Sequence, residues 1–478
     1  MNGAPATGPG RPADDADDPR PDDPRPDDPR PDDAGPDDTR PDAGPDDAGR
    51  PLVRVVVVNY NGAHLLPDCL DALAAQEAPF GVEVCVVDNG STDGSVELLR
   101  RSHPGVTVID AGRNLGFAAG NNLAVESAST PYVALINNDA RPDRDWIANL
   151  VAPLQQDKGL AATTGKLLFL PRFVEVELET EPFAPGRLDG RDLGVTVYSV
   201  TVDGHDVTGS VLWDRVAHPP EPGFRRTRPA GRLFVPMPDG QRGTIRMRLA
   251  AERTKKATIG GEAIVVTTEP AEYTVRVEDG HPLVDVIQNA GGVVLPGGYG
   301  ADRGYQEVDP GQVDPGQYDE PSDVNLCGGS ACLRTDAFRA AGGFDADFFM
   351  YYEDTDLSLR LRARGWRIRY VPTARARHLH AASAVVGSEF FTFHVERNRL
   401  LTLTKHAPAA AVVREVLRFP LTTASLAVRE VARARLARRR PSITPTVVRL
   451  RVMASYLRLL PRMVRRRTRP DRRAGSRG

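Results

Sequence analysis

The sequence predicts an α/β protein that carries an inserted antiparallel β module and ends in a basic helical tail. Three observations support this fold class. Between residues 53 and 139 buried strand patterns alternate with helical patterns, between residues 172 and about 282 short runs of alternating polarity replace them, and beyond residue 409 arginines recur at near-helical spacing. With 478 residues and 40% hydrophobic content, the chain is long enough for two or three domains.

The first 50 residues differ in composition from the rest of the chain. They repeat variants of Pro-Asp-Asp-Pro-Arg, hold 15 Asp and 6 Arg, and offer almost nothing that could be buried. Such a segment cannot offset the entropy cost of ordering, so we expect residues 1–50 to be a disordered leader. Electrostatic screening of the basic tail is one role open to it, and an inert solvated leader is the favoured interpretation.

Cysteine usage and hydropathy indicate the redox environment of the protein and whether any segment spans a membrane. The four cysteines are too few and too scattered for a disulfide scaffold or a zinc site, which indicates a reducing, cytoplasmic environment. No secretory signal opens the chain and no run of about 18 apolar residues is present, so we expect no segment to span a membrane.

The α/β part begins with four strands that each end near polar residues. The first three are followed by a polar or Gly-rich turn and then by a helix. Because crossover helices bring the carboxyl ends of parallel strands to one edge of a sheet, these polar residues should share one rim. The predicted strands cover residues 53–58, 82–87, 106–109 and 133–136, and the rim residues are Asn61, Asp88, Asn114 and Asp139.

The fourth strand ends in Asn137, Asn138 and Asp139, which form the first candidate site. A carboxylate beside two amides at the end of a buried strand can hold a divalent cation, and such a cation would neutralise a diphosphate. We therefore expect Asp139 to bind a metal ion. The alternative is that these residues form a turn that caps the next helix, because Asn and Asp satisfy backbone donors in such places.

A change of pattern follows the first α/β segment. A helix over residues 143–154 and a strand over residues 160–170 complete a nucleotide-binding half that we expect to span residues 51–171. Residues 172–283 are predicted to form half-buried strands separated by Pro, Gly and Asp turns, which is typical of an antiparallel sandwich or barrel. Carbohydrate binding and packing are both open as roles of this inserted module, and packing is favoured.

The α/β pattern resumes over residues 284–408. Gly328 and Gly329 lie in a predicted strand over residues 326–333, where paired glycines permit close approach by a ligand or another backbone. Glu353, Asp354 and Asp356 follow an aromatic run and open a helix. Capping needs only one of these acids, so a carboxylate at this position is a candidate general base.

Five motifs, in this order, resemble those of the family 2 inverting glycosyltransferases, and most closely the bacterial rhamnosyltransferase-like branch. The resemblance covers roughly residues 53–170 and 284–406 and implies a GT-A fold, a nucleotide-diphosphate-binding α/β domain and sugar transfer with inversion. The motifs are Asn-Tyr-Asn-Gly at 59–62, Val-Asp-Asn-Gly-Ser-Thr-Asp-Gly at 87–94, Arg-Asn-Leu-Gly-Phe at 113–117, Asn-Asn-Asp at 137–139 and Tyr-Glu-Asp-Thr-Asp-Leu at 352–357.

The resemblance also implies roles for single residues. Asp88 would accept a hydrogen bond from a pyrimidine base, and Asp139, as the last residue of the family's Asp-X-Asp element, would ligate Mg²⁺ or Mn²⁺. Asp354 would deprotonate the acceptor hydroxyl, and Glu353 would orient it. The donor-binding residues expected on this basis are Asn59, Asn61, Asp88, Asn114, Asn137, Asn138, Gly328, Gly329 and Arg397.

His378 matches a histidine that completes the metal shell in some relatives. A second metal ligand matters because Asn137 stands where the family commonly has its first Asp, which predicts a weaker metal site. As an alternative, His378 belongs with Arg375, Arg377 and His380 to a basic loop that faces phosphates.

The tail over residues 409–478 is strongly basic, with 19 Arg and three acids. Its segments 412–440 and 447–467 alternate apolar residues with Arg, a pattern that suits an anionic cytoplasmic leaflet, where each basic residue adds about 1 kcal/mol of attraction. Nucleic acid is the rival partner, but few aromatics are present for base stacking, so we expect none to be bound. Just before the tail, Arg397 is expected to face phosphates, and Arg399 to lie on a solvated helix face.

The sequence thus predicts a metal-dependent glycosyltransferase, peripheral at the inner face of the cell membrane. By resemblance, the donor is a dTDP- or UDP-linked sugar with rhamnose favoured, and the acceptor is a cell-envelope glycan or a polyprenyl-linked precursor. Two alternatives are a nucleotidyltransferase, which would use the strand-end metal on phosphorus, and a non-catalytic glycan-binding protein with a relic site. The absence of a Gly-rich, Lys-bearing triphosphate loop argues against the first.

Overall fold

The computed structural model describes residues 50–467, apart from 187–189, 215, 219–220, 222, 238–242, 276, 278–281, 310, 312–323, 380–386 and 437–439. The predicted leader and His380 therefore lie outside the described residues. Residues 50–478 belong to one compact unit, so the domain boundaries at 171, 283 and 408 stay predictions.

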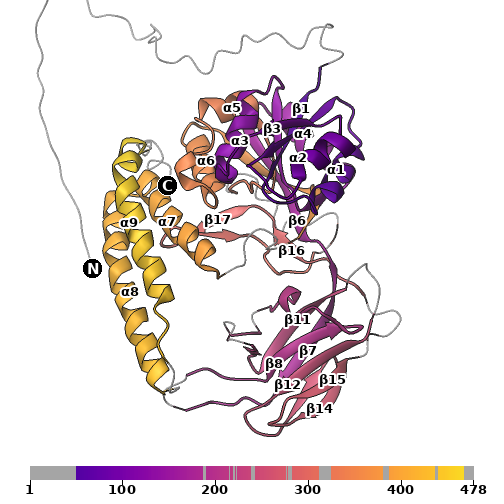
Figure 1. Ribbon diagram of the computed structural model, residues 1–478, viewed down its shortest axis with the longest axis vertical. Helices are drawn as coiled ribbons and strands as arrows, with labels where there is room; N and C mark the ends of the chain where they lie inside the picture. The colour runs from indigo at the N-terminus through magenta and orange to yellow at the C-terminus, as the bar shows by residue number, and fades with distance from the viewer. Residues whose placement is uncertain are drawn as a thin grey trace, which may run out of the picture. The chain divides into compact units, whose positions relative to one another are not determined.

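A single large sheet forms the centre of the α/β part (Figure 1). Its strands run in the order β3-β2-β1-β4-β19-β6-β20-β5, with β16 paired to β6. The first four of these are parallel, as the alternation of strands and helices predicts. The bounds are β1 Val53–Asn59, β2 Val82–Asp88, β3 Thr107–Asp110, β4 Tyr132–Asn137, β5 Ala140–Pro142, β6 Leu160–Phe169, β16 Ile287–Asn289, β19 Ser330–Arg334 and β20 Arg367–His378.

Helices cover both faces of this sheet. Apolar residues of β1 alternate between the faces, with Val55 and Val57 in one cluster and Val56 in the other. The first cluster is covered by α1, α2 and α4, and the second by α3, α5 and α6. Their bounds are α1 Leu66–Ala74, α2 Ser95–Ser102, α3 Gly116–Glu126, α4 Trp146–Gln156, α5 Thr335–Ala340 and α6 Glu353–Arg362.

The strand β19 enters the sheet antiparallel to both of its neighbours, β4 and β6. It begins at Ser330, so Gly328 and Gly329 lie in the turn before the strand. The prediction that both glycines lie within a strand is therefore wrong. The two glycines therefore stand at the same edge of the sheet as the carboxyl end of β4, where Ser330 is paired with Ile136.

The predicted inserted module is an antiparallel double sheet. One sheet has the order β10-β8-β12-β15, with β9 paired to β8, and the other has the order β11-β7-β13-β14. Valines, leucines and methionines from both sheets share one core, which explains the alternating pattern. The bounds are β7 Arg172–Thr180, β8 Thr196–Val202, β9 His205–Asp206, β10 Arg225–Arg226, β11 Ala230–Met237, β12 Ile245–Ala250, β13 Lys255–Ile259, β14 Glu262–Val266 and β15 Ala271–Val275.

A two-stranded hairpin and three long helices follow the module and the return to the sheet. The hairpin consists of β17 Gly292–Leu295 and β18 Tyr299–Asp302. Helices α7 Glu389–His406, α8 Ala409–Leu436 and α9 Thr444–Arg465 share a core around Phe419 and Tyr456 (Figure 1). None of the helices, over the residues described, is long and apolar enough to cross a bilayer.

These observations confirm the predicted fold class, an α/β domain with an inserted antiparallel module and a helical tail. The prediction that Arg399 lies on a solvated helix face is wrong. Its side chain is 3% exposed, pairs with Glu396 and Glu415, and lies 4.3 Å above the ring of Tyr299. Helix α7 is covered by the hairpin and the tail helices, so both sides of it are interior.

A buried ion network joins α6 to α7. Asp356 is fully buried and bonds Arg360 at 2.8 Å, Lys405 at 2.7 Å and His406 at 2.8 Å. These three cationic partners hold the pKa of Asp356 well below its usual range despite its burial. The third acid of the Glu-Asp-Thr-Asp motif is therefore structural.

We predict that Asp356→Asn lowers the free energy of unfolding by about 3–5 kcal/mol, because it leaves the buried charge of Lys405 without full compensation. The measurement is urea unfolding at pH 7, with Asp71→Asn, an exposed acid of α1, as the control. A depressed pKa stabilises the fold above the unfolded value of about 3.9, so the difference between variant and wild type should shrink as the pH falls below that value. Equal midpoints for both variants at pH 7 would contradict a stabilising network.

Candidate active site

The carboxyl ends of β1, β2 and β4 meet in a hydrogen-bonded cluster. In the parallel register Asn59 is opposite Asp88, and Val58 is opposite Asn137. The Asn59 amide donates to Asp88 Oδ1 at 3.0 Å and accepts from the Asn138 amide at 2.8 Å, and the other Asp88 oxygen accepts from the Ser91 backbone N–H at 2.8 Å. Asn59 and Asp88 are both buried. The structure thus brings these three predicted site residues together.

Two further predicted residues lie on the same rim but are exposed. Asn61 has a positive φ of 51° and accepts at 2.8 Å from the N–H of Thr92, so it links the first two strand ends. Asn114 accepts from the N–H of Gly116 at 2.9 Å at the start of α3. This contact is the capping turn described by the alternative reading of such Asn residues.

Asp139 and His378 face each other across the ends of β4 and β20. The distance from Asp139 Oδ1 to His378 Nε2 is 2.9 Å, and the Asn137 amide lies 2.9 Å from the same ring nitrogen. The other ring nitrogen lies 2.8 Å from Gln288 Oε1. When Nδ1 donates to Gln288, Nε2 points a lone pair at a carboxylate oxygen, an arrangement that a cation between the two atoms stabilises.

The alternative of a phosphate-facing basic loop finds no support in the two neighbouring arginines. Arg375 pairs with Asp143 and Arg377 with Asp285, each at 2.8 Å. Both guanidinium groups therefore contribute to internal ion pairs beside β20.

Gly328 and Gly329 lie between the two carboxylate sites. A Cβ on Gly329 would stand 3.2 Å from the Asn137 amide, and one on Gly328 would stand 2.9 Å from the ring of Phe117 and 4.0 Å from the Cβ of Asp354. The N–H of Gly328 donates to Asp354 Oδ2 at 3.3 Å. The glycine turn therefore joins the metal-ligand pair to the acids at the start of α6.

Glu353 and Asp354 sit in contrasting environments. Asp354 accepts from the N–H groups of Gly328 and Thr355, whereas Glu353 is 5% exposed and its Oε2 has no hydrogen-bond partner among the described residues. Burial raises the pKa of both carboxyls, and that of Glu353 furthest because Asp354 adds a like charge. Of the two, Asp354 therefore ionises at the lower pH and is the candidate base.

Asp302 joins this site, although it lies in none of the five motifs. It ends β18 and is held by the Asn289 amide at 2.5 Å. It remains solvent-exposed, yet the protein that surrounds it raises its pKa to about 6, with a contribution from Asp354. No short-range motif could have shown this, because the hairpin carries Asp302 to the site.

Arg397 lies apart from this cluster, in the core between α7 and the turn before α6. It donates to the carbonyl oxygens of Asp347 at 3.2 Å and Phe348 at 2.7 Å, and to Asn398 Oδ1 at 2.8 Å. Desolvation lowers its pKa to about 10. The guanidinium group thus makes its hydrogen bonds to other groups of the protein. These contacts give no support to the predicted donor-binding role.

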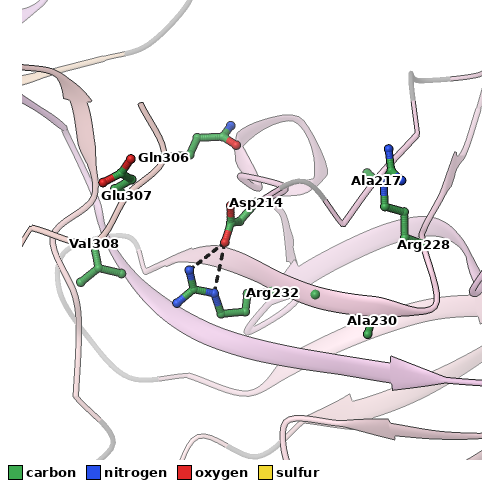
Figure 2. A pocket seen from close by; sticks show the side chains of 9 residues that line it. Asp214, Ala217, Arg228, Ala230, Arg232, Gln306, Glu307 and Val308 are labelled. Atoms are coloured by element: carbon green, nitrogen blue, oxygen red, sulfur yellow. Dashed lines mark hydrogen bonds and ion pairs between the residues drawn. The ribbon is translucent and has the colours of Figure 1, made fainter. Parts of the chain in front are cut away.

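A large cleft lies elsewhere, between the module and the segment that follows β18. It measures about 970 Å³ and contains none of the predicted site residues. Figure 2 shows its polar wall, where Arg232 bonds Asp214 opposite Gln306 and Glu307. This cleft is therefore separate from the carboxylates at the strand ends.

Comparison with known families matches the two segments that supply the site. The profile of glycosyl transferase family 2 matches residues 54–167, and that of glycosyl transferase family group 2 matches residues 321–396. These two segments, less than half of the chain together, therefore resemble family 2 and family group 2 glycosyl transferases. The mixed sheet with its parallel first half is typical of the GT-A fold of such transferases.

Several curated relatives align with parts of this chain. Glycosyltransferase AglE of Haloferax volcanii is 31% identical over 108 residues, which cover 22% of this chain and 36% of AglE. The N-acetylglucosaminyl-diphospho-decaprenol L-rhamnosyltransferase of Mycobacterium tuberculosis is 48% identical over 67 residues, 13% of this chain and 22% of the relative. Rhamnosyltransferase WbbL of Escherichia coli is 41% identical over 75 residues, which cover 15% of this chain and 28% of WbbL. The alignments thus span well under half the length of these relatives.

Solved structures show distant likeness. A mannosyltransferase of Pyrobaculum calidifontis in complex with GDP-Man and Mn²⁺ aligns with a TM-score of 0.37 and 16% identity over 88% of this chain and 91% of the other. GalNAc-T7 with UDP, GalNAc and Mn²⁺ aligns with a TM-score of 0.39 and 13% identity over 74% of this chain and 48% of the other.

Proposed function

We propose that this protein is an inverting glycosyltransferase that moves a sugar, with rhamnose favoured, from a dTDP- or UDP-linked donor to a cell-envelope glycan or a polyprenyl-linked acceptor. The observation that carries the proposal is that the Gly328–Gly329 turn bonds Asp354 and also lies beside Asn137, which in turn contacts His378 of the Asp139–His378 pair. These residues lie inside the two segments that match glycosyl transferase models. The two rhamnosyltransferases among the partial relatives support the choice of sugar.

Each group of residues has a distinct task in the proposed reaction. Asp88, held by Asn59 and Ser91, presents a fixed carboxylate for the base of the nucleotide. The ionised Asp354 takes the proton of the acceptor hydroxyl as its oxygen attacks the anomeric carbon, and the nucleotide diphosphate leaves from the opposite face. Because attack and departure occur in line, the configuration at that carbon inverts and no covalent enzyme intermediate forms.

The pair of Asp139 and His378 fits a divalent metal ion. Adjacent ligands of octahedral Mg²⁺, each about 2.1 Å from the metal, stand roughly 3 Å apart, close to the 2.9 Å between Asp139 Oδ1 and His378 Nε2. Among the described residues, no three or more His, Cys, Asp or Glu side chains are grouped so that they could hold a metal ion, so the other ligands would come from the diphosphate and water. When bound, the cation would offset the charge that develops on the departing diphosphate.

Asp354→Asn should lower kcat for sugar transfer by about 10²–10⁴-fold, because an amide cannot accept the acceptor proton. A panel of nucleotide sugars, with transfer measured by release of nucleoside diphosphate in the presence of acceptor, checks this expectation. Asp71→Asn serves as the control. Pyrophosphate release from a nucleoside triphosphate would instead support a nucleotidyltransferase.

The acid limb of the pH profile of kcat/KM provides a second check on the same base. Only ionised Asp354 is active and its pKa is raised, so activity should fall as the pH drops through a midpoint above the ordinary carboxyl value of about 3.9. A midpoint at or below that value would contradict the assignment of Asp354.

Removal of divalent metal by a chelator should abolish transfer, and added Mn²⁺ or Mg²⁺ should restore it. His378→Ala should raise the metal concentration needed for half-maximal activity and the dissociation constant for Mn²⁺, measured by electron paramagnetic resonance, by at least about tenfold. The control is His205→Ala in β9 of the inserted module. Full activity in excess chelator would contradict the metal assignment.

We also propose that α8 and α9 bind an anionic membrane surface, which would bring a lipid-linked acceptor to the enzyme. The exposed sides of both helices carry apolar residues at near-heptad spacing beside exposed arginines, while their opposite sides pack in the core around Tyr456. The exposed large apolar residues are Val413, Leu417, Leu421, Leu426, Val428 and Val431 on α8 and Val447, Leu450, Leu457 and Val464 on α9.

The protein should co-sediment with vesicles that contain phosphatidylglycerol but not with pure phosphatidylcholine, and high salt should weaken the binding. Leu421→Ser should lower vesicle affinity by about tenfold, since about 1.4 kcal/mol of apolar burial is lost. Val265→Ser, which changes an exposed apolar residue of the inserted module, is the control. Binding to duplex DNA in place of vesicles would favour the rival partner.

A further inference from the structure

The backbone just before Glu353 adopts a conformation that L-amino acids avoid. Phe349, Tyr351 and Tyr352 have φ values of 67°, 66° and 70°, and none of them is glycine. Bulky aromatic residues rarely occupy this left-handed region, and strained residues of this kind persist only where the surroundings fix them. This turn leads directly into α6, whose first residues are Glu353 and Asp354.

A single amide from α7 holds this turn. Asn398 is fully buried, and its Nδ2 donates to the carbonyl oxygens of Phe348 at 3.0 Å, Met350 at 2.8 Å and Tyr351 at 2.7 Å. The Nε of Arg397 donates to Asn398 Oδ1 at 2.8 Å. This second contact fixes which end of the amide faces the turn, so Asn398 is oriented as a donor to all three carbonyls.

The donor side of the site supports the same turn from the other direction. The N–H of Ala118 in α3 donates to the carbonyl of Phe349 at 3.1 Å. At Gly116, whose φ is 79°, a Cβ would lie 2.5 Å from both the ring and the carbonyl oxygen of Phe349. The Arg-Asn-Leu-Gly-Phe motif therefore needs its glycine to let the turn approach.

We propose that Asn398 is a positioning residue for the transfer reaction, which fixes the left-handed turn and so directs the Asp354 carboxylate at the acceptor. This inference rests on the proposed function. It also gives Arg397 a task, since that side chain orients the Asn398 amide and donates to the same turn at Phe348.

The test begins with Asn398→Ala in an enzyme whose unmutated form transfers sugar. Loss of the three hydrogen bonds should let the turn relax and lower kcat per folded molecule by about 10- to 100-fold, because small displacements of a reacting group are costly. The donor KM should stay within about twofold, since Asn59 and Asp88 at the ends of β1 and β2 are held by each other and by Ser91 and Asn138. Thr402→Val is the matched control, because the buried Thr402 hydroxyl of α7 makes no hydrogen bond within the described residues.

A second substitution separates positioning from a general loss of stability. Tyr351→Gly removes the conformational penalty of the positive φ, because glycine adopts it freely. In the Asn398→Ala background, Tyr351→Gly should restore kcat at least several-fold. If Asn398→Ala alone does not fold, the double variant is measured in its place. Wild-type kcat in Asn398→Ala, or equal loss of kcat with and without Tyr351→Gly, would overturn the positioning role alone. No transfer by the unmutated protein would instead overturn the proposed function.

Discussion

The antiparallel entry of β19 between β4 and β6 is the constraint on which the candidate site depends. The parallel half of the sheet supplies Asp88 and Asp139 at its carboxyl edge, but the candidate base lies more than 200 residues further along the chain. Because β19 runs in the opposite direction, the turn that precedes it, Gly328–Gly329, stands at that same edge. Glycine is needed at both positions, since a Cβ there would come too close to Phe117 or Asn137.

Charge and strain concentrate around one short segment, residues 347–356. Cations around the buried Asp356 lower the pKa of its carboxyl, whereas burial and the like charge of Asp354 raise the pKa of Glu353. Three left-handed residues precede them, held by hydrogen bonds from α3 and α7. Neighbouring acids thus have different roles because each faces a different part of the fold.

Local pattern predicted much of this architecture, because buried strands and amphipathic helices leave distinct periodicities. The polar strand ends at Asn59, Asp88 and Asp139 followed from those periodicities together with parallel topology, and the approach of His378 to Asp139 followed from family resemblance. Asp302 and Gln288 were not predicted, because a hairpin and a short returning strand bring them to the site. Arg397 and Arg399 were misjudged because the sequence of α7 does not reveal that other elements cover it on both sides.

The manner in which the β module joins the sheet has an evolutionary consequence. The chain leaves through β6 and returns through β16, and these strands pair antiparallel, with a last bridge between Phe173 and Val284. The whole module is therefore the loop of one hairpin. Because entry and exit are neighbours, lineages can gain, lose or exchange such an appendage through changes at a single junction, while the strands that hold the catalytic groups keep their register.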